Sequence, residues 1–261
     1  MDAPVLDFGA LLRHWRQHRG LTQLALALDA EVSSRHLSWL EGGKSLPSRA
    51  MLLRLAERLD VPLRERNRWL RAAGFAPLYR EGPLAPQALA QVQALLDAHE
   101  PAPALAVDRH WQLVAANRLL PALLAGVDPA LLGPPLNVLR VALHPRGLAP
   151  RIHNLPAWRG HVLARLKRQV QTSGDATLAA LHAELSGYGS EAEAVDHDPF
   201  DDGLALPLQL NSAAGVLSFI STITVFGAPH DTLLSELALE TFLPADAATA
   251  AALRALLAGL G

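Results

Sequence analysis

Residues 21–44 read LTQLALALDAEVSSRHLSWLEGGK, and this stretch predicts two short helices joined by a tight turn. Thr22 and Ser33 each stand where a hydroxyl can accept a hydrogen bond from an unpaired backbone N–H at the start of a helix. Leu37 and Leu40 give the second helix an apolar side, and small polar and basic residues occupy its beginning. This pattern is typical of a helix-turn-helix, whose second helix, here residues 34–40, enters the major groove of DNA.

The first 80 residues as a whole predict five helices. Phe8, Leu11, Leu12 and Trp15 follow the spacing of one helical face, and Gly20 ends that helix. Residue 48 begins a fourth helix, and a proline at 62 separates it from a fifth that ends near residue 74. We therefore expect an all-α bundle, with the alternative that its polar residues are merely solvated.

The charges are distributed unevenly along the chain. The total is 23 basic and 25 acidic residues, but residues 1–80 carry 13 basic and 8 acidic ones, a balance of +5. A basic first domain favours a polyanionic partner such as double-stranded DNA. The absence of cysteine excludes disulfides and thiolate metal sites, and no stretch of about 18 apolar residues occurs. We expect a cytoplasmic protein with no membrane contact.

The chain beyond residue 80 changes character. Residues 81–86, EGPLAP, predict a hinge, because two prolines and a glycine cannot continue a helix. A helix that ends near residue 99 follows. Further on, the patterns predict strands at 104–107, 111–115, 204–211 and 216–226, and helices at 117–124 and 246–257. We therefore expect a helix-turn-helix domain at 1–80, a hinge and linker helix at 81–100, and an α+β domain at 101–261.

One predicted strand and one predicted helix supply candidate walls for a cavity. On the strand, one face carries Leu217, Phe219, Ser221, Ile223 and Val225, and we expect this face to point inward. Ser221 would be a lone polar group there, either a ligand contact or a hydroxyl bonded locally to backbone. The helix has an apolar residue at every fourth position from 158 to 170, which predicts that its basic residues, at 159, 165, 167 and 168, face outward.

Polar residues gather shortly before that helix. His144, Arg151 and Asn154 fall between predicted elements, and Trp158 follows one helical turn later. An arginine beside an apolar cavity can pair with the carboxylate of an amphipathic acid. The alternatives are that Arg151 is a surface residue and that Asn154 only caps the helix of Trp158.

The first domain resembles the XRE family, whose helix-turn-helix domains are lambda-repressor-like, over residues 8–73. The motifs that carry the resemblance are residues 21–23, 32–33, 37–38 and 41–43. Glu31 departs from the family, which usually has glycine in the turn, and a left-handed conformation there costs about 1 kcal/mol. The resemblance implies that Gln23 and Lys44 meet phosphates and that the exposed side of the second helix approaches base edges. The full set of expected DNA contacts is Thr22, Gln23, Ser33, Ser34, Arg35, His36, Ser38, Trp39, Lys44 and Arg49.

The second domain carries two further resemblances. Residues 103–117 look like the opening strands of a PAS domain, and residues 135–140, 144–147, 151–154 and 217–227 resemble the MmyB-like transcription regulators. In that family an XRE head precedes a PAS-like domain that holds a fatty acid. The resemblance therefore implies a small hydrophobic, fatty-acid-like ligand and no other cofactor. The expected ligand contacts are His144, Arg151, Asn154, Trp158, Phe219, Ser221 and Ile223.

Enzyme signatures are weak. His14 and His18 are four residues apart, but Trp15 stands where a zinc protease needs its glutamate, so we expect no metal site. The aspartates between residues 196 and 202 lack the spacing of a calcium loop and predict a solvated loop. We expect a transcription regulator that reads an inverted repeat as a homodimer and is not an enzyme. The alternatives are a protein-interaction module with a degenerate helix-turn-helix and a hydrolase.

Overall fold

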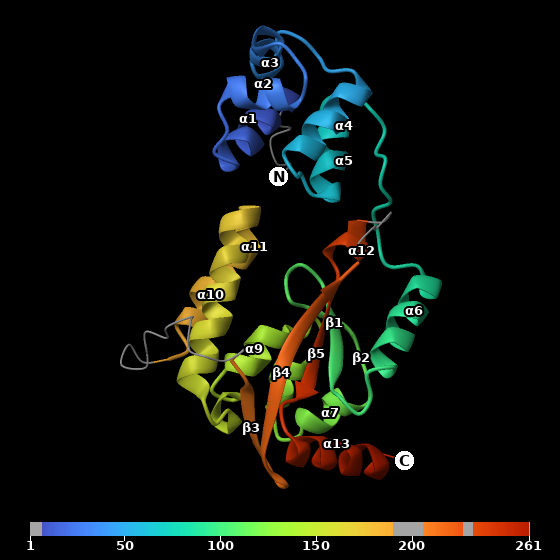
Figure 1. The fold of residues 1–261 in the computed structure, drawn as a ribbon, viewed down its shortest axis with the longest axis vertical. Coiled ribbons are helices and arrows are strands. Elements are labelled where there is room, and N and C mark those ends of the chain that lie inside the picture. Colours follow the sequence, from blue (N-terminus) through green and yellow to red (C-terminus); the bar gives the residue numbers. More distant parts are fainter. Residues whose placement is uncertain (1–6, 190–205, 227–231, 261) are drawn as a thin grey trace. The chain divides into compact units, whose positions relative to one another are not determined.

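The computed structural model describes residues 7–189, 206–226 and 232–260 (Figure 1). The chain forms two compact units. The first comprises residues 1–83 together with 227–235, and the second comprises residues 84–226 and 236–261. The aspartates of 196–202 and the expected strand start at residue 204 lie outside the described residues.

The first unit is built on five short helices, as the sequence predicts. They are α1 (Phe8–His18), α2 (Gln23–Asp29), α3 (Ser34–Glu41), α4 (Arg49–Arg58) and α5 (Leu63–Ala72). The side chains of Asp7, Thr22, Ser33 and Ser48 each accept a backbone hydrogen bond at the start of one of the first four helices. These caps define where the helices begin and how sharply the chain turns between them.

The core of the first unit joins α1, α3 and α5. Phe8 and Trp69 are buried edge to face, with ring centroids 5.5 Å apart, and the fully buried Leu37 and Leu40 pack into the same cluster. Glu31 lies in the turn between α2 and α3 with φ 54°, so the expected left-handed turn forms without glycine. The expected helix-turn-helix bundle is confirmed.

The end of the first unit is held by one wholly buried amide. The Nδ2 atom of Asn67 donates to Tyr79 O and Glu81 Oε1, both at 2.7 Å, and its Oδ1 atom accepts from Leu78 N and Tyr79 N. Thr232, at the start of α12 (Thr232–Glu236), donates from its hydroxyl to the carbonyl oxygen of residue 80 at 2.9 Å. A segment between two strands of the other unit's sheet therefore belongs to the first unit.

The second unit is an α+β domain around a five-stranded antiparallel sheet, as expected for a PAS-like fold. Its strands are β1 (Ala104–Val107), β2 (Leu113–Ala116), β3 (Leu208–Ser212), β4 (Gly215–Val225) and β5 (Ala238–Pro244), in the order β2-β1-β5-β4-β3. The predicted β3–β4 hairpin forms. The strand β2 begins two residues later than predicted, because Trp111 has φ 64° and still belongs to the turn. The sequence did not predict β5.

Helices cover both faces of this sheet (Figure 1). They are α6 (Pro86–Asp97), α7 (Leu119–Leu123), α8 (Pro129–Leu132), α9 (Val138–Leu143), α10 (Leu155–Ser173), α11 (Ala176–Ser186) and α13 (Ala247–Gly259), with a 3-10 turn at Ala149–Arg151. Trp158, Val162 and Leu166 of α10 pack with Leu105 and Phe219 of the sheet. Helix α6 packs against β1 and β2, and the buried Asn117 ties it to the sheet by donating to Leu96 O.

The expected inward face of β4 is only half correct. Leu217 and Phe219 are buried, but Ile223 is 42% exposed and Val225 is 66% exposed. The pairing of the strand gives the reason. Residues 215–219 of β4 pair with β3 and residues 219–225 pair with β5, so Phe219 has a partner strand on both sides, whereas residues 220–225 pair with β5 alone. The second half of β4 is therefore a sheet edge, and the expectation that Ile223 and Val225 face the core is wrong.

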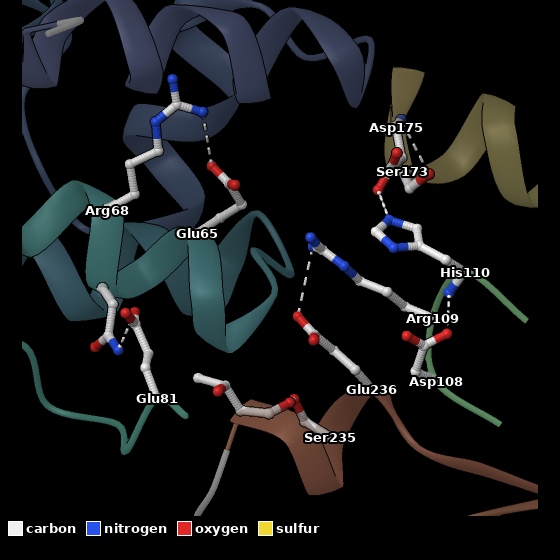
Figure 2. Close-up of polar contacts among 12 residues, drawn as sticks. Glu65, Arg68, Glu81, Asp108, Arg109, His110, Ser173, Asp175, Ser235 and Glu236 are labelled. Carbon is white, nitrogen blue, oxygen red and sulfur yellow. Dashed lines mark hydrogen bonds and ion pairs between the residues drawn. The ribbon is translucent and has the colours of Figure 1, made fainter. Parts of the chain in front are cut away.

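Polar contacts fix the turn between β1 and β2 (Figure 2). Asp108 Oδ1 accepts from the backbone N–H of His110 at 2.8 Å. His110 Nε2 lies 2.9 Å from Asp175 Oδ2, at the start of α11, and Arg109 lies 3.6 Å from Glu236. Burial would raise the pKa of Asp175, but the hydrogen bond with His110 and backbone N–H groups hold it below its ordinary value. The turn is thereby attached to α11 and to the segment that precedes β5.

Candidate DNA-reading helix and ligand cavity

The two faces of α3 differ as the sequence predicts. Leu37 and Leu40 are fully buried, while Ser34, Arg35, Ser38 and Trp39 are exposed. The hydroxyl of Ser33 accepts from the backbone N–H of His36 at 3.1 Å and starts the helix. The helix therefore presents small polar, basic and aromatic side chains on the face opposite the core, which is the arrangement that major-groove reading needs.

One arginine on this face is already oriented. The guanidinium carbon of Arg35 lies 4.7 Å from the centre of the Trp39 ring. The two residues are one helical turn apart, and a cation over an indole face gains about 0.5–1 kcal/mol at an exposed site. The stacked guanidinium keeps its planar N–H edge available for a base.

A buried carboxylate holds the first three helices together. Glu41 of α3 accepts from Arg16 of α1, at 2.6 Å from Nε and 2.9 Å from Nη2, and from Gln23 of α2 at 2.8 Å. Burial would raise the pKa of Glu41, but hydrogen bonds from Arg16 and Gln23 and the charges of Arg16 and Arg13 lower it below its ordinary value. This network fixes the angle at which α3 is presented.

The remaining expected DNA contacts lie around α3 on the same unit. Thr22, Lys44 and Arg49 are exposed, whereas Gln23 and His36 are partly buried. The hydroxyl of Thr22 serves as a helix cap, and the amide of Gln23 is bonded to Glu41. Contact with DNA stays a prediction for every one of these residues.

The second unit contains an apolar cavity between the sheet and the helices α7, α9 and α10. The free space between its lining atoms totals about 820 Å³ when the part open to solvent is included, so the enclosed part is smaller. Its walls are mainly leucine, valine and aromatic side chains, among them Leu105, Leu120, Leu139, Trp158, Leu210 and Phe219. Trp158 and Phe219 are thus two of the seven residues expected from the sequence as ligand contacts.

Two charged residues of the described part of the chain line the cavity, and the sequence patterns did not predict either of them as a ligand contact. Arg165 of α10 and Glu240 of β5 both line it, with Arg165 Nη1 at 3.2 Å from Glu240 Oε1. Ser221 of β4 donates its hydroxyl to the same Oε1 at 2.5 Å. The hydroxyl of Ser221 therefore does not bond to backbone, and Ser221 does not line the cavity. Its hydroxyl positions the carboxylate of Glu240. A lone glutamate within the apolar run of residues 237–243 was the available signal.

The polar residues expected to hold a ligand head group lie elsewhere. Arg151 Nη1 donates to Leu123 O and Ala125 O, both at 2.9 Å, and Asn154 bridges to β3 through Pro207 O and Gln209 N. His144 Nδ1 accepts from the backbone N–H of residue 146 at 2.9 Å. None of the three lines the cavity. Their contacts give them a role in holding loops against the sheet.

The basic residues of α10 also differ from expectation. Arg159 is 8% exposed and donates to Leu185 O at 3.1 Å, and Arg165 lines the cavity, so neither faces outward as the four-residue stripe predicts. Helix α11 packs alongside α10 and covers Arg159, whereas Arg165 points toward the sheet and pairs with Glu240 of β5. Only Lys167 and Arg168 of this group are exposed.

Arg151→Ala tests the structural role of this side chain. We expect a loss of about 1–3 kcal/mol of unfolding free energy, because the carbonyl oxygens of Leu123 and Ala125 lose a charged donor. Thermal unfolding of the full chain measures this loss. Arg146→Ala is the control, because the guanidinium of Arg146 is exposed where it pairs with Asp128, and exposed ion pairs contribute little to stability. If the Arg151→Ala chain keeps its stability but no longer binds an amphiphile, the structural role is contradicted and Arg151 is a ligand contact.

Neither a membrane span nor a metal cluster is found within residues 7–189, 206–226 and 232–260. No helix there is long and apolar enough to cross a bilayer. No group of three histidine or acidic side chains there has a geometry that could hold a metal ion.

Comparison with known proteins identifies both units. Residues 7–69 match a family model described as a helix-turn-helix domain, and residues 89–256 match one described as the MmyB-like transcription regulator ligand binding domain. No curated protein sequence matches the chain. The second model covers well over half of the chain. The first covers α3, the residues that cap it and the helices around it. The chain therefore belongs to the MmyB-like transcription regulators, a family of DNA-binding regulators and not of enzymes.

Proposed function

We propose that the protein reads an inverted-repeat operator as a homodimer in the cytoplasm, where its DNA lies, and that an amphiphile with a long apolar chain, a fatty acid or a relative of one, regulates it. The observation that carries the proposal is the exposed face of α3, with Ser34, Arg35, Ser38 and Trp39, on a helix whose other side is fully buried. The apolar cavity of the second unit is the observation that favours the proposed ligand class.

On DNA, the residues divide by role. Arg35 is placed near the start of α3 and binds a guanine edge through two N–H groups, as arginine does in major grooves. Lys44, in the loop that follows α3, and Arg49, at the start of α4, are exposed cations, and they neutralise phosphates. Gln23 is held by Glu41 and leaves its amide oxygen and backbone N–H for positioning contacts.

In the ligand domain, the apolar walls supply the affinity. Each methylene of a ligand that leaves water for such walls gains about 0.8 kcal/mol, so chain length sets the strength of binding. Binding alone does not regulate. The ligand shifts DNA binding only as far as its affinity differs between two conformations of the chain.

Half-site dependence tests the dimer. A duplex selected from a random pool by the full chain should contain an inverted repeat whose half-sites are about one helical turn apart, with two chains bound. Halving the repeat should weaken binding by about 100-fold or more, because the second contact is no longer intramolecular. Gel shift measures the affinity, and native mass spectrometry counts the chains.

A matched duplex with a scrambled second half-site is the control for length and charge. Equal affinity for whole and half operators, with one chain bound, would contradict reading as a dimer. A selection that enriches no sequence would instead indicate a protein-interaction module that does not read DNA.

A further inference from the structure

The charged wall of the cavity is electrically balanced before any ligand enters. Arg165 and Glu240 form an ion pair at 3.2 Å, and both line the cavity. The side chain of Glu240 is 4% exposed and that of Arg165 is 15% exposed. A ligand therefore meets one positive and one negative charge that already neutralise each other in a largely apolar space.

The carboxylate of Glu240 is held in place on several sides. Its strand β5 pairs with β1 through Leu105 and with β4 through Ile223, so the backbone lies in the middle of the sheet. Ser221 donates to Oε1 at 2.5 Å, next to the contact from Arg165. A ligand cannot push this carboxylate into water without breaking these contacts.

Arg165 is held as well, but one of its donors is unused. Its guanidinium carbon lies 4.4 Å from the ring centre of Trp111, so stacking fixes its plane. Its Nε atom is buried and has no hydrogen-bond partner in the structure. A buried N–H without an acceptor costs free energy, and an oxygen atom from a ligand head group would satisfy it.

Among the residues that the structure describes, Arg165 is the only cation in the lining of the cavity. His161, one turn before Arg165 on α10, stacks on Trp158. Partial burial, followed by the charges of Arg165 and Arg168, lowers the pKa of His161 below its ordinary value. An ionised carboxylate bound here would share Arg165 with Glu240, and two neighbouring carboxylates disfavour each other's ionised form.

We propose that the cavity selects an amphiphile whose head group is uncharged and both donates and accepts hydrogen bonds. An alcohol or primary amide fits directly, accepting from Arg165 and donating to Glu240. A fatty acid fits only together with one proton, shared between its carboxyl group and Glu240. This inference rests on the proposed function, because it specifies the head group of the ligand proposed there.

The first test compares three ligands of equal chain length on the full chain: decanoic acid, decan-1-ol and decanamide. Calorimetry at about pH 6 and about pH 8 should give the alcohol and the amide unchanged affinities. The acid should weaken about tenfold per pH unit, about 100-fold in all, because its protonated fraction falls by that factor above a carboxyl pKa of about 4–5. Buffers of different ionisation enthalpy should show uptake of one proton with the acid.

Glu240→Gln provides the second test, because the amide keeps the shape of the side chain and removes the competing charge. At about pH 8 decanoate should bind this variant at least about tenfold more tightly than wild type, and without pH dependence, while decan-1-ol changes less than about threefold. Glu184→Gln is the matched control. Glu184 also pairs with an arginine, Arg140, but lies outside the cavity, and its replacement should change none of the three affinities.

The outcomes separate this inference from the proposed function. Decanoate that binds wild type equally well at both pH values, and at least as tightly as the alcohol, would overturn the uncharged head group while keeping the amphiphile. If none of the three ligands binds at either pH, the amphiphile itself is wrong, and this inference fails with it. The wild-type comparison decides the matter even if Glu240→Gln does not fold.

Discussion

Glu41→Gln is expected to lower the unfolding free energy of the first unit by about 3–5 kcal/mol, the usual cost of removing one partner of a buried ion pair. The substitution leaves Arg16, whose side chain is 12% exposed, without its carboxylate. It also weakens the contact with Gln23 that ties α2 to α3. Urea unfolding of the full chain, combined with hydrogen exchange of the α1–α3 amides, measures the loss.

The pH dependence of the same group follows from its lowered pKa. A carboxyl whose pKa is lower in the folded state stabilises the fold above its unfolded pKa, and this contribution disappears as the pH falls through the folded value. In the wild type, the stability of α1–α3 should therefore decrease as the pH falls below about 4.5. The Glu41→Gln chain should lack this part of the pH dependence.

Glu65→Gln is the control for this substitution. Glu65 pairs with Arg68 at 3.5 Å on an exposed surface of α5 (Figure 2), and its loss should cost no more than about 0.5 kcal/mol. Equal effects of the two substitutions would show that Glu41 does not hold the three helices together.

Arg35→Ala is expected to weaken binding to the selected operator by about 10- to 100-fold while changing binding to random DNA much less. A two-pronged contact between arginine and guanine discriminates by about 1–3 kcal/mol, and the stacking on Trp39 keeps the guanidinium ready for it. Gel shift or fluorescence anisotropy on both duplexes, at one salt concentration, measures the two affinities.

Lys44→Ala is the matched control on the same unit. A cation that meets only a phosphate should weaken all duplexes about equally and reduce the slope of log affinity against log salt by about one. If Arg35→Ala behaves in the same way, Arg35 contacts the backbone of DNA and not a base.

The sequence by itself determined the helix-turn-helix almost completely. Thr22 and Ser33 cap their helices, Glu31 takes the left-handed turn, and Leu37 and Leu40 face the core, all as predicted. These features depend on neighbours three or four residues away, so the local pattern contains the information. The exposed face of α3 follows from the same periodicity.

The strands and the final helix of the second unit were also predictable where the signal is local. The β3–β4 hairpin forms at residues 212–215, and Asp246 caps α13. The limit appears within β4 itself, where Phe219 is buried and Ile223 is not. Alternation along a strand indicates which residues share a face, but the partner strand on each side decides how much of that face is covered.

Only the tertiary structure decided where the polar groups of the ligand domain lie. Arg151 and Asn154 are close in sequence to residues that line the cavity. Their hydrogen bonds nevertheless go to backbone groups of residues 123, 125, 207 and 209, in loops and in a strand. Arg165 and Glu240 are 75 residues apart and meet because β5 enters the middle of the sheet opposite α10. Charged pairs of this kind arise from packing between distant segments, for which the local periodicity of a sequence has no signal.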